Sequence, residues 1–406
     1  MKYSILTFGC RVNQADSMVI ERDLRARGGV AVPSAEADVI VVNSCSVTAT
    51  ADQGTRQAIR RAARENPSAR IVVTGCYATR SADEVAALPG VVAVVPNTQK
   101  ETLVASHVPF RNNTPLPGTV PLVVPVPAYL LDRTARSIRV QTGCDEDCSY
   151  CIIPSTRGKS TSRRMDELVT ELQHAEASGV LDVTLTGVHL GAYGRDLTPP
   201  SSLDQLLRAA ADATRRLLIR LGSLEPTDVP AALVDLAEAG RLAPAFHLPL
   251  QHASDRLLAR MRRPYRLAEY RRTVDHLRER LPHAAIGSDI IVGFPGETDA
   301  DVDCLCDYLE TSPLTSLHVF PYSDRPGTEA TTLADKVPGP VVRERGRRVR
   351  DIGERLAARF RASQSGSERP ALTIEDGSVA VTDNGFRVRT GPGHRRNERI
   401  LVAVAF

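Results

Sequence analysis

The stretch "GCDEDCSYCIIP", residues 143–154, brings together three of the eight cysteines in the chain, Cys144, Cys148 and Cys151. A disulfide would pair two of these thiols and leave the third over. Zinc usually takes four ligands, and no fourth ligand stands near these three. An iron–sulfur cubane can bind three thiolates and keep its fourth iron open. The spacing therefore favours a metal cluster at which chemistry can take place.

This cysteine loop follows the first of six predicted strands, and a helical stretch separates each strand from the next. The strands are "SIRVQT", "LDVTLTG", "LLIRLGS", "AFHLPLQ", "IGSDIIVG" and "SLHVFPYS". Six β/α units are typical of a closed or partly closed barrel of parallel strands. Active sites in such barrels lie at the carboxyl ends of the strands. The predicted fold class is α/β, with a central partial (β/α)6 barrel and the cysteine loop at its active end.

The first hundred residues also alternate apolar strands with amphipathic helices. Strands are predicted at residues 3–8, 38–44, 70–75 and 91–97. Continuous apolar strands separated by helices indicate a parallel sheet that is covered on both faces. We therefore expect a separate N-terminal α/β domain.

Three more cysteines, Cys10, Cys45 and Cys76, come directly after these strands, in "LTFGC", "VVNSC" and "VVTGC". A single buried cysteine is usually an inert small hydrophobe. The carboxyl ends of parallel strands, however, meet at one edge of the sheet, where α/β folds bind ligands. The pattern therefore predicts that the three thiols gather in one crevice. Cys304 and Cys306, inside a predicted helix, are interpreted as ordinary helix residues.

The rest of the chain divides by composition. Six prolines between residues 101 and 135 indicate a linker. Eight arginines against three acids in residues 341–363 indicate a basic helix, which is either a solvated face or a patch for phosphates. Asp-Gly and Asn-Gly turns after it indicate short antiparallel strands. The predicted parts are an N-terminal domain at 1–100, a linker at 101–135, a barrel at 136–340, a basic helix at 341–366 and a small all-β domain at 367–406.

Composition sets the broad class of the protein. The 406 residues are 42% hydrophobic and 24% charged, with a net charge of +3, which is ordinary for a globular chain. No stretch approaches the roughly 20 apolar residues that span a bilayer. The beginning, "MKYSILTFGCRVNQADS", has no secretory leader. We therefore expect a cytoplasmic protein without a membrane partner, in which clustered cysteines more often bind metal than form disulfides.

The spacing Cys-x3-Cys-x2-Cys, with Tyr150 just before the last cysteine, resembles the signature of radical S-adenosylmethionine enzymes. More narrowly, the chain resembles the methylthiotransferases, which have an N-terminal domain with three separated cysteines, a radical barrel and a small C-terminal β domain of the TRAM type. The resemblance runs through nearly the whole chain. It is carried by "GCDEDCSYCIIPSTRG", "HLPLQHASDRLLARMRR", "DIIVGFPGET" and "FPYSDRPGT".

Local motifs point to one group within that family. "TFGCRVNQADS" and "TGVHLGAYGRDL" are similar to the group that acts on threonylcarbamoyladenosine in transfer RNA. The group acting on isopentenyladenosine typically carries Gln-Met-Asn after its first cysteine, and the group acting on a ribosomal protein aspartate carries Pro-Lys-Asn. Here Arg11, Val12 and Asn13 follow Cys10. The resemblance implies a transfer RNA (N6-L-threonylcarbamoyladenosine-C2)-methylthiotransferase.

The resemblance also implies two 4Fe–4S clusters and S-adenosylmethionine as cofactors. Cys144, Cys148 and Cys151 would hold the cluster that binds S-adenosylmethionine and yields a radical able to attack carbon 2 of the adenine ring. The three upstream cysteines would hold the second cluster, which carries the sulfur. An electron donor such as flavodoxin or ferredoxin and a sulfur source are implied as partners.

Further residues are assigned by their place at the ends of the predicted barrel strands or next to the cluster loop. The expected contacts to S-adenosylmethionine are Tyr150, Thr186, Gly187, Ser223, Glu225 and Gln251. The expected contacts to the transfer RNA anticodon stem-loop are Arg157, Arg163, Arg164, Arg347, Arg348 and Arg350.

Two other kinds of function stay open on the sequence. One is a methylthiotransferase that acts on isopentenyladenosine or on a ribosomal protein aspartate. The other is an RNA-binding protein without turnover, in which metal only pins the fold. The barrel argues against the second, because a structural pin needs no crevice of that size.

Overall fold

The computed structural model describes residues 1–109 and 135–405. The chain forms two compact units. Of the described residues, the first takes 1–109, 142–160 and 325–328, and the second takes 135–141, 161–324 and 329–405. Most of the expected linker lies outside the described residues. Its first part is instead helical, because helix α5 (Leu103–His107) stands there.

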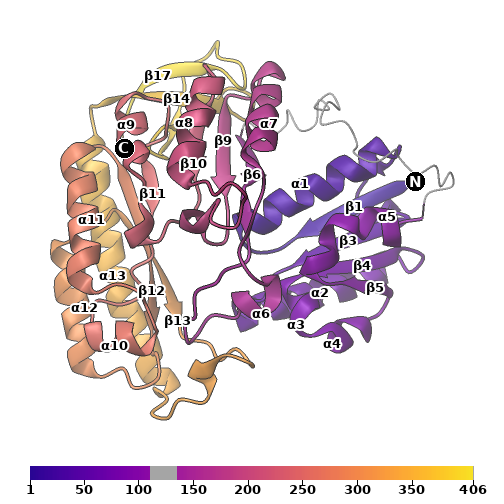
Figure 1. Ribbon diagram of the computed structural model, residues 1–406, viewed down its shortest axis with the longest axis horizontal. Helices are drawn as coiled ribbons and strands as arrows, with labels where there is room; N and C mark the ends of the chain where they lie inside the picture. Colours follow the sequence, from indigo (N-terminus) through magenta and orange to yellow (C-terminus); the bar gives the residue numbers. More distant parts are fainter. Residues whose placement is uncertain (110–134, 406) are drawn as a thin grey trace. The chain divides into compact units, whose positions relative to one another are not determined.

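A parallel sheet in the order β2-β1-β3-β4-β5 forms the centre of the first unit (Figure 1). Its middle strand β3 is buried along its whole length. Val39 and Val41 pack into a cluster with residues of α1, while Ile40 and Val42 pack into another with residues of α2. The predicted sheet with two covered faces is confirmed. The strands are β1 (Lys2–Thr7), β2 (Val30–Ala31), β3 (Val39–Ser44), β4 (Arg70–Gly75) and β5 (Val91–Val95), and the helices are α1 (Arg11–Ala26), α2 (Ala49–Glu65), α3 (Cys76–Arg80) and α4 (Ala82–Ala86).

Six parallel strands form the barrel of the second unit. Two three-stranded sheets, β6-β9-β10 and β11-β12-β13, are joined by single bridges between Ile219 and Leu242 and between Ser223 and His247. No pairing closes β6 onto β13 in the described part of the chain, so the barrel is partial, as predicted. Its strands are β6 (Ala135–Arg139), β9 (Asp182–Thr186), β10 (Leu218–Leu221), β11 (Ala245–His247), β12 (Ala285–Val292) and β13 (Ser316–Pro321).

Helices cover the outer side of these strands and bury one large apolar core. They are α7 (Met165–Ala177), α8 (Leu203–Ala213), α9 (Ala231–Glu238), α10 (Asp255–Arg260), α11 (Leu267–Arg280) and α12 (Asp299–Thr311). Cys306 of α12 is buried in that core, whereas Cys304 is exposed. This placement agrees with an ordinary helical role for both residues.

The predicted basic helix is α13 (Gly339–Gln364). Its apolar residues Val349, Ile352 and Leu356 belong to the barrel core, and Gly353 lies against Leu317 of β13. The helix therefore covers the barrel with one face and turns arginines to solvent with the other. No helix among the described residues is long and apolar enough to cross a membrane.

An antiparallel sheet in the order β16-β15-β14-β17 ends the chain, in agreement with the predicted all-β domain. Its strands are β14 (Glu368–Ile374), β15 (Val379–Thr382), β16 (Arg387–Arg389) and β17 (Arg399–Ala403). Gly377 and Gly385 of the Asp-Gly and Asn-Gly turns have φ of +99° and +96°, in the left-handed region that glycine tolerates.

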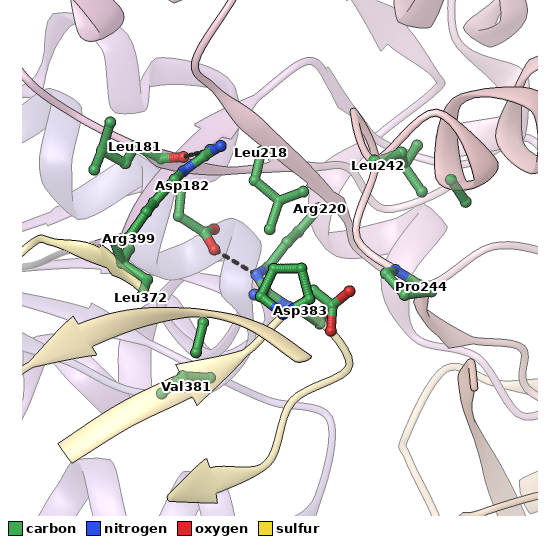
Figure 2. Close-up of a pocket in the computed structure, with 14 residues that line it drawn as sticks. Leu181, Asp182, Leu218, Arg220, Leu242, Pro244, Leu372, Val381, Asp383 and Arg399 are labelled. Carbon is green, nitrogen blue, oxygen red and sulfur yellow. Dashed lines mark hydrogen bonds and ion pairs between the residues drawn. The ribbon is translucent and has the colours of Figure 1, made fainter. Parts of the chain in front are cut away.

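The β sheet packs against the amino ends of two barrel strands (Figure 2). The guanidinium of Arg220 pairs with Asp182, the first residue of β9, at 2.7 Å and donates to the Asp383 carbonyl at 2.9 Å. Arg399 of β17 donates to the Leu181 carbonyl at 3.1 Å. A cavity of about 90 Å³ remains at this seam. The β domain thus occupies the end of the barrel opposite the carboxyl ends of β9 and β10.

Candidate functional site

Cys10, Cys45 and Cys76 come after three neighbouring strands of the first unit, β1, β3 and β4. Cys45 and Cys76 are buried and Cys10 is exposed, and all three are free thiols. Burial raises the pKa of Cys45 to about 11, and the charges of Cys10 and Cys76 act in the same direction. The structure therefore brings the three thiols into one group at the sheet edge.

Two glycines make room for this group. Gly9 has a φ of +89°, and a Cβ there would lie 2.5 Å from Cys45 Sγ. Gly75 has a φ of +99°, and a Cβ there would lie 2.2 Å from the Ser44 carbonyl oxygen. Both residues turn the chain sharply between a strand and the next cysteine. Any other side chain would clash at these positions as well as strain the backbone.

A buried charge network lies beside the thiols. Asp16 accepts from Lys100 Nζ at 2.9 Å and from Arg157 Nη2 at 3.2 Å, and Arg157 also bonds Asn13. Burial alone would lower the pKa of the Arg157 guanidinium, but the charges of Cys76, Asp16 and Cys10 outweigh it and raise that pKa. Burial lowers the pKa of Lys100, and the charge of Arg157 adds to this effect. One carboxylate here serves two cations.

In a second network, one carboxylate again pairs with two cations. Asp52, whose charge acts on Cys45, accepts from Arg80 and from Arg325, each at 2.8 Å. Arg325 is buried and comes from the "SDRPGT" segment, far along the chain. Four cations therefore share two carboxylates around the thiols in the described structure. Positive side chains beside the thiols would stabilise an anionic group there, such as an iron–sulfur cluster with its thiolates.

The loop with Cys144, Cys148 and Cys151 belongs to the first unit as well. The Cys144 amide donates to the Gly158 carbonyl at 3.1 Å, and the Glu146 amide donates to Cys144 Sγ at 3.4 Å. An N–H group thus points at a sulfur that would bind iron in a cluster. Gly143 allows the two ends of this loop to meet, because the Cβ of any other residue there would lie 1.9 Å from the Lys159 carbonyl oxygen.

Short helix α6 (Ile153–Arg157) ties this loop to the upstream thiols. It packs against α3, which begins with Cys76. Asn97 Nδ2 lies 2.9 Å from the Thr156 carbonyl oxygen and 3.7 Å from Cys76 Sγ. The sequence-based boundaries assign residues 142–160 to the barrel domain, but their contacts group them with the N-terminal unit. Both cysteine triples are therefore built into one compact unit.

The expected contacts to S-adenosylmethionine in the second unit follow the carboxyl ends of successive strands. Thr186 ends β9 and is buried, with Gly187 next to it. Ser223 bonds His247 at 2.8 Å, and Glu225 pairs with Arg263. Tyr150 is half-buried in the first unit. The barrel residues thus share one edge, at the carboxyl ends of the strands.

Gln251 follows β11 and departs from ordinary backbone geometry. Its φ is +65°, and its amide donates to the Asp289 carbonyl at 2.8 Å. A left-handed conformation is uncommon for glutamine and is characteristic of functional sites. Gln251 therefore holds a strained backbone conformation next to β12, and its contact with S-adenosylmethionine stays a prediction.

A polar cluster on the inner side of the barrel was not predicted. His247 Nε2 and His318 Nδ1 lie 3.0 and 3.2 Å from the same Asp289 oxygen. Burial would raise the pKa of Asp289, but the hydrogen bonds from both histidines outweigh it and lower that pKa to about 2. Gly287 leaves space for the His247 ring. The sequence signal that could have predicted this cluster is the polar residues at alternate positions of three adjacent, otherwise apolar strands.

The predicted RNA-contacting arginines divide into three kinds. Arg157 is buried, so the prediction that it contacts RNA is wrong. Arg163 is half-buried and paired with Glu171 at 2.8 Å. The remaining four are exposed, although Arg164 pairs with Asp166 and Arg348 with Asp303. They are Arg164, Arg347, Arg348 and Arg350.

Two family models match the chain. Residues 2–96 match the "uncharacterized protein family UPF0004", and residues 138–309 match the radical SAM superfamily. The first match covers the sheet with Cys10, Cys45 and Cys76. The second begins in β6, before the Cys144 loop, and runs into α12.

Curated relatives match over most of their length. A threonylcarbamoyladenosine tRNA methylthiotransferase MtaB from Aquifex aeolicus is 34% identical over 96% of this chain and 96% of that protein. The Bacillus subtilis protein of the same name is 34% identical over 94% and 88%. A tRNA-2-methylthio-N(6)-dimethylallyladenosine synthase from Corynebacterium efficiens is 36% identical over 87% and 71%.

Solved structures share the fold at low identity. The radical S-adenosylmethionine methyltransferase TsrM from Kitasatospora setae, solved with cobalamin and a [4Fe-4S] cluster, aligns with a TM-score of 0.56 and 16% identity over 81% of this chain and 73% of that one. The cobalamin-dependent radical enzyme OxsB aligns with a TM-score of 0.51 and 9% identity over 87% and 56%.

Proposed function

Because this chain belongs to the radical S-adenosylmethionine methylthiotransferases, we propose that it adds a methylthio group to carbon 2 of N6-threonylcarbamoyladenosine next to the anticodon of transfer RNA. One observation carries the choice of substrate. The relatives named for threonylcarbamoyladenosine match this chain over nearly their full length, from the N-terminal sheet to the C-terminal strands.

The two cysteine triples fit two 4Fe–4S clusters. Cys144, Cys148 and Cys151 would hold the cluster to which S-adenosylmethionine binds, and Cys10, Cys45 and Cys76 would hold the second. When bound, these groups supply one-electron cleavage of S-adenosylmethionine and the sulfur that is transferred. The positive side chains around the second triple support an anionic occupant there.

The residues of the chain hold and orient these groups. Thr186 and Gly187 would offer a hydroxyl and backbone groups at the end of β9 to the polar groups of S-adenosylmethionine. Ser223 and Gln251 stand after the next strands, and Glu225 is held by Arg263. Tyr150 would contact the cofactor from the cluster loop. Each of these contacts binds or orients the cofactor rather than moving a proton.

The proposed substrate and reaction imply partners. The anticodon stem-loop is an anion, and the exposed arginines of α13 are suited to its phosphates. The reaction consumes electrons and sulfur, so a donor such as flavodoxin or ferredoxin and a sulfur source are needed. Because the proposed substrate is transfer RNA, the proposed place of action is the cytoplasm.

The second candidate substrate is dimethylallyladenosine, also called isopentenyladenosine, in transfer RNA. The 36% identity to the Corynebacterium efficiens synthase favours it, over a smaller share of that protein. An experiment that offers both substrates in parallel separates the two candidates.

The test uses the full chain with reconstituted clusters and three anticodon stem-loops, which carry threonylcarbamoyladenosine, isopentenyladenosine or unmodified adenosine. Nucleoside mass spectrometry should find the methylthio product with the first alone. Equal product from the isopentenyl stem-loop would reject the proposed substrate. Variants with alanine at Cys10, Cys45 and Cys76 should still cleave S-adenosylmethionine to 5′-deoxyadenosine but transfer no sulfur, since only the second cluster is lost.

A further inference from the structure

Arg157 stands at an unusual junction in the first unit. It is the last residue of α6, six positions after Cys151, yet its guanidinium is buried among residues of the N-terminal sheet domain. It bonds Asn13 of α1 and lies 3.2 Å from Asp16. Arg157 therefore belongs to the chain segment of one cysteine triple and to the surroundings of the other.

Among the described residues, Arg157 shares its carboxylate partner with a second cation. Asp16 is the carboxylate it contacts, and Lys100 is closer to the same oxygen, at 2.9 Å. The charges of Cys76 and Cys10 also act on the guanidinium. A charge in such a poorly solvated place acts strongly on a neighbouring anion, because little water screens it.

We propose that Arg157 is a positioning residue that sets the reduction potential of the cluster held by Cys10, Cys45 and Cys76. The inference rests on the proposed function, since it takes these thiols to hold a cluster. Reduction adds an electron to that cluster and makes it more negative. A buried cation beside it stabilises the reduced form and raises the potential, because hydrogen bonds and nearby charge tune such clusters.

Arg157 also links the two cysteine triples mechanically. The neighbouring Thr156 carbonyl accepts from Asn97, and the same Asn97 nitrogen lies 3.7 Å from Cys76 Sγ. Any shift of α6 would therefore move both a hydrogen-bond donor and a charge relative to Cys76. The segment that follows Cys151 thus tunes the upstream cluster.

The experiment compares Arg157→Gln, which removes the charge, with Arg157→Lys, which keeps it. Each is made in the full chain with Cys144, Cys148 and Cys151 replaced by alanine, so that a single cluster gives the signal. The midpoint potential is measured by redox titration followed by electron paramagnetic resonance. Arg61→Gln removes the same charge from an exposed position on α2 and is the matched control.

At a fixed applied potential, Arg157→Gln should lower the ratio of reduced to oxidised cluster at least tenfold. A tenfold change corresponds to a midpoint potential lower by about 59 mV for a one-electron couple. Arg157→Lys and Arg61→Gln should stay near the parent chain. A full iron content with an unchanged potential in Arg157→Gln would overturn the proposal.

Iron content distinguishes the other outcomes. If Arg157→Gln fails to bind iron while Arg157→Lys binds it at the parent potential, the charge is needed to hold the cluster rather than to set its potential, and the proposal is rejected. If neither variant binds iron, Arg157 is needed for packing and the proposal is rejected. If the parent chain itself binds no iron at the upstream triple, the proposed second cluster is what fails.

Discussion

Gly75 shows how much of the upstream thiol site depends on single residues. It separates the buried strand β4 from Cys76, with a φ of +99°. Its hydrogen atoms lie where a Cβ would meet the Ser44 backbone at 2.2 Å. The backbone at Gly75 lies directly against the backbone of β3, which leads to Cys45. This close approach is possible only because Gly75 has no side chain. One glycine thus sets the spacing of two thiols.

Gly75→Ala should therefore cost more stability than backbone strain alone. Gly28 provides a matched control, because its φ is +80° and nothing lies within 4 Å of a Cβ built there. Gly28→Ala should cost about 1–2 kcal/mol from the left-handed backbone, and Gly75→Ala should cost several kcal/mol and lose about half of the bound iron. Thermal unfolding and iron analysis measure both effects. Equal losses of stability in the two variants would contradict the role given to the Ser44 contact.

At the scale of elements, α13 combines a structural and a surface role. Its apolar side completes the barrel core through Val349, Ile352 and Leu356. On its other side Arg347 and Arg350 are exposed and have no acidic partner among the described residues, whereas Arg355 is paired with Glu310. Surface arginines that are already paired contribute less to an electrostatic patch. The helix therefore presents a few specific positive charges to solvent.

Replacing Arg347 and Arg350 with glutamine should weaken transfer RNA binding and flatten its dependence on salt by about one to two units of the logarithmic slope. With each phosphate contact that is lost, RNA binding releases fewer counterions, and the affinity depends less on salt. Arg355→Gln is the matched control on the same helix and should change the slope less. Binding isotherms at several salt concentrations measure the slope. An unchanged slope in the double variant would exclude α13 from the RNA contact.

At the scale of the whole chain, the two units do not follow the order of the sequence. The first unit takes in residues 142–160 and 325–328 as well as its N-terminal sheet. In the second unit the C-terminal sheet is held to the amino ends of the barrel strands by Arg220 and Arg399. The carboxyl ends of the strands, where the candidate cofactor contacts lie, are thereby left clear of the β domain.

Arg399→Ala should loosen the β domain from the barrel. Its guanidinium donates to the carbonyls of Leu181 and Arg216, and both acceptors would be left without this donor. We expect a loss of about 1–3 kcal/mol in stability and faster proteolytic cleavage in the segment that joins α13 to β14. Arg387→Ala, whose side chain pairs with Glu375 inside the β domain, is the control. Equal proteolysis of both variants would show that the seam does not depend on Arg399.

The sequence by itself determined the features that depend on local pattern. Alternation of apolar strands with helical stretches predicted the parallel sheet and the partial barrel. The Asp-Gly and Asn-Gly turns predicted the antiparallel end, because such turns join neighbouring antiparallel strands. The position of Cys10, Cys45 and Cys76 after strands predicted their meeting, because parallel strands end at one edge. The spacing of Cys144, Cys148 and Cys151 pointed to a cluster loop.

Only the tertiary structure decided which distant charges meet. Arg157 was predicted to contact RNA from its position near the loop, but burial beside Asp16 and Lys100 directs it to the thiols. Arg325 reaches Asp52, 273 residues away in the chain. His247, Asp289 and His318 become one cluster only because their strands pair side by side. Charge pairing depends on the distance between groups in space and on the exclusion of solvent, and a local sequence pattern determines neither.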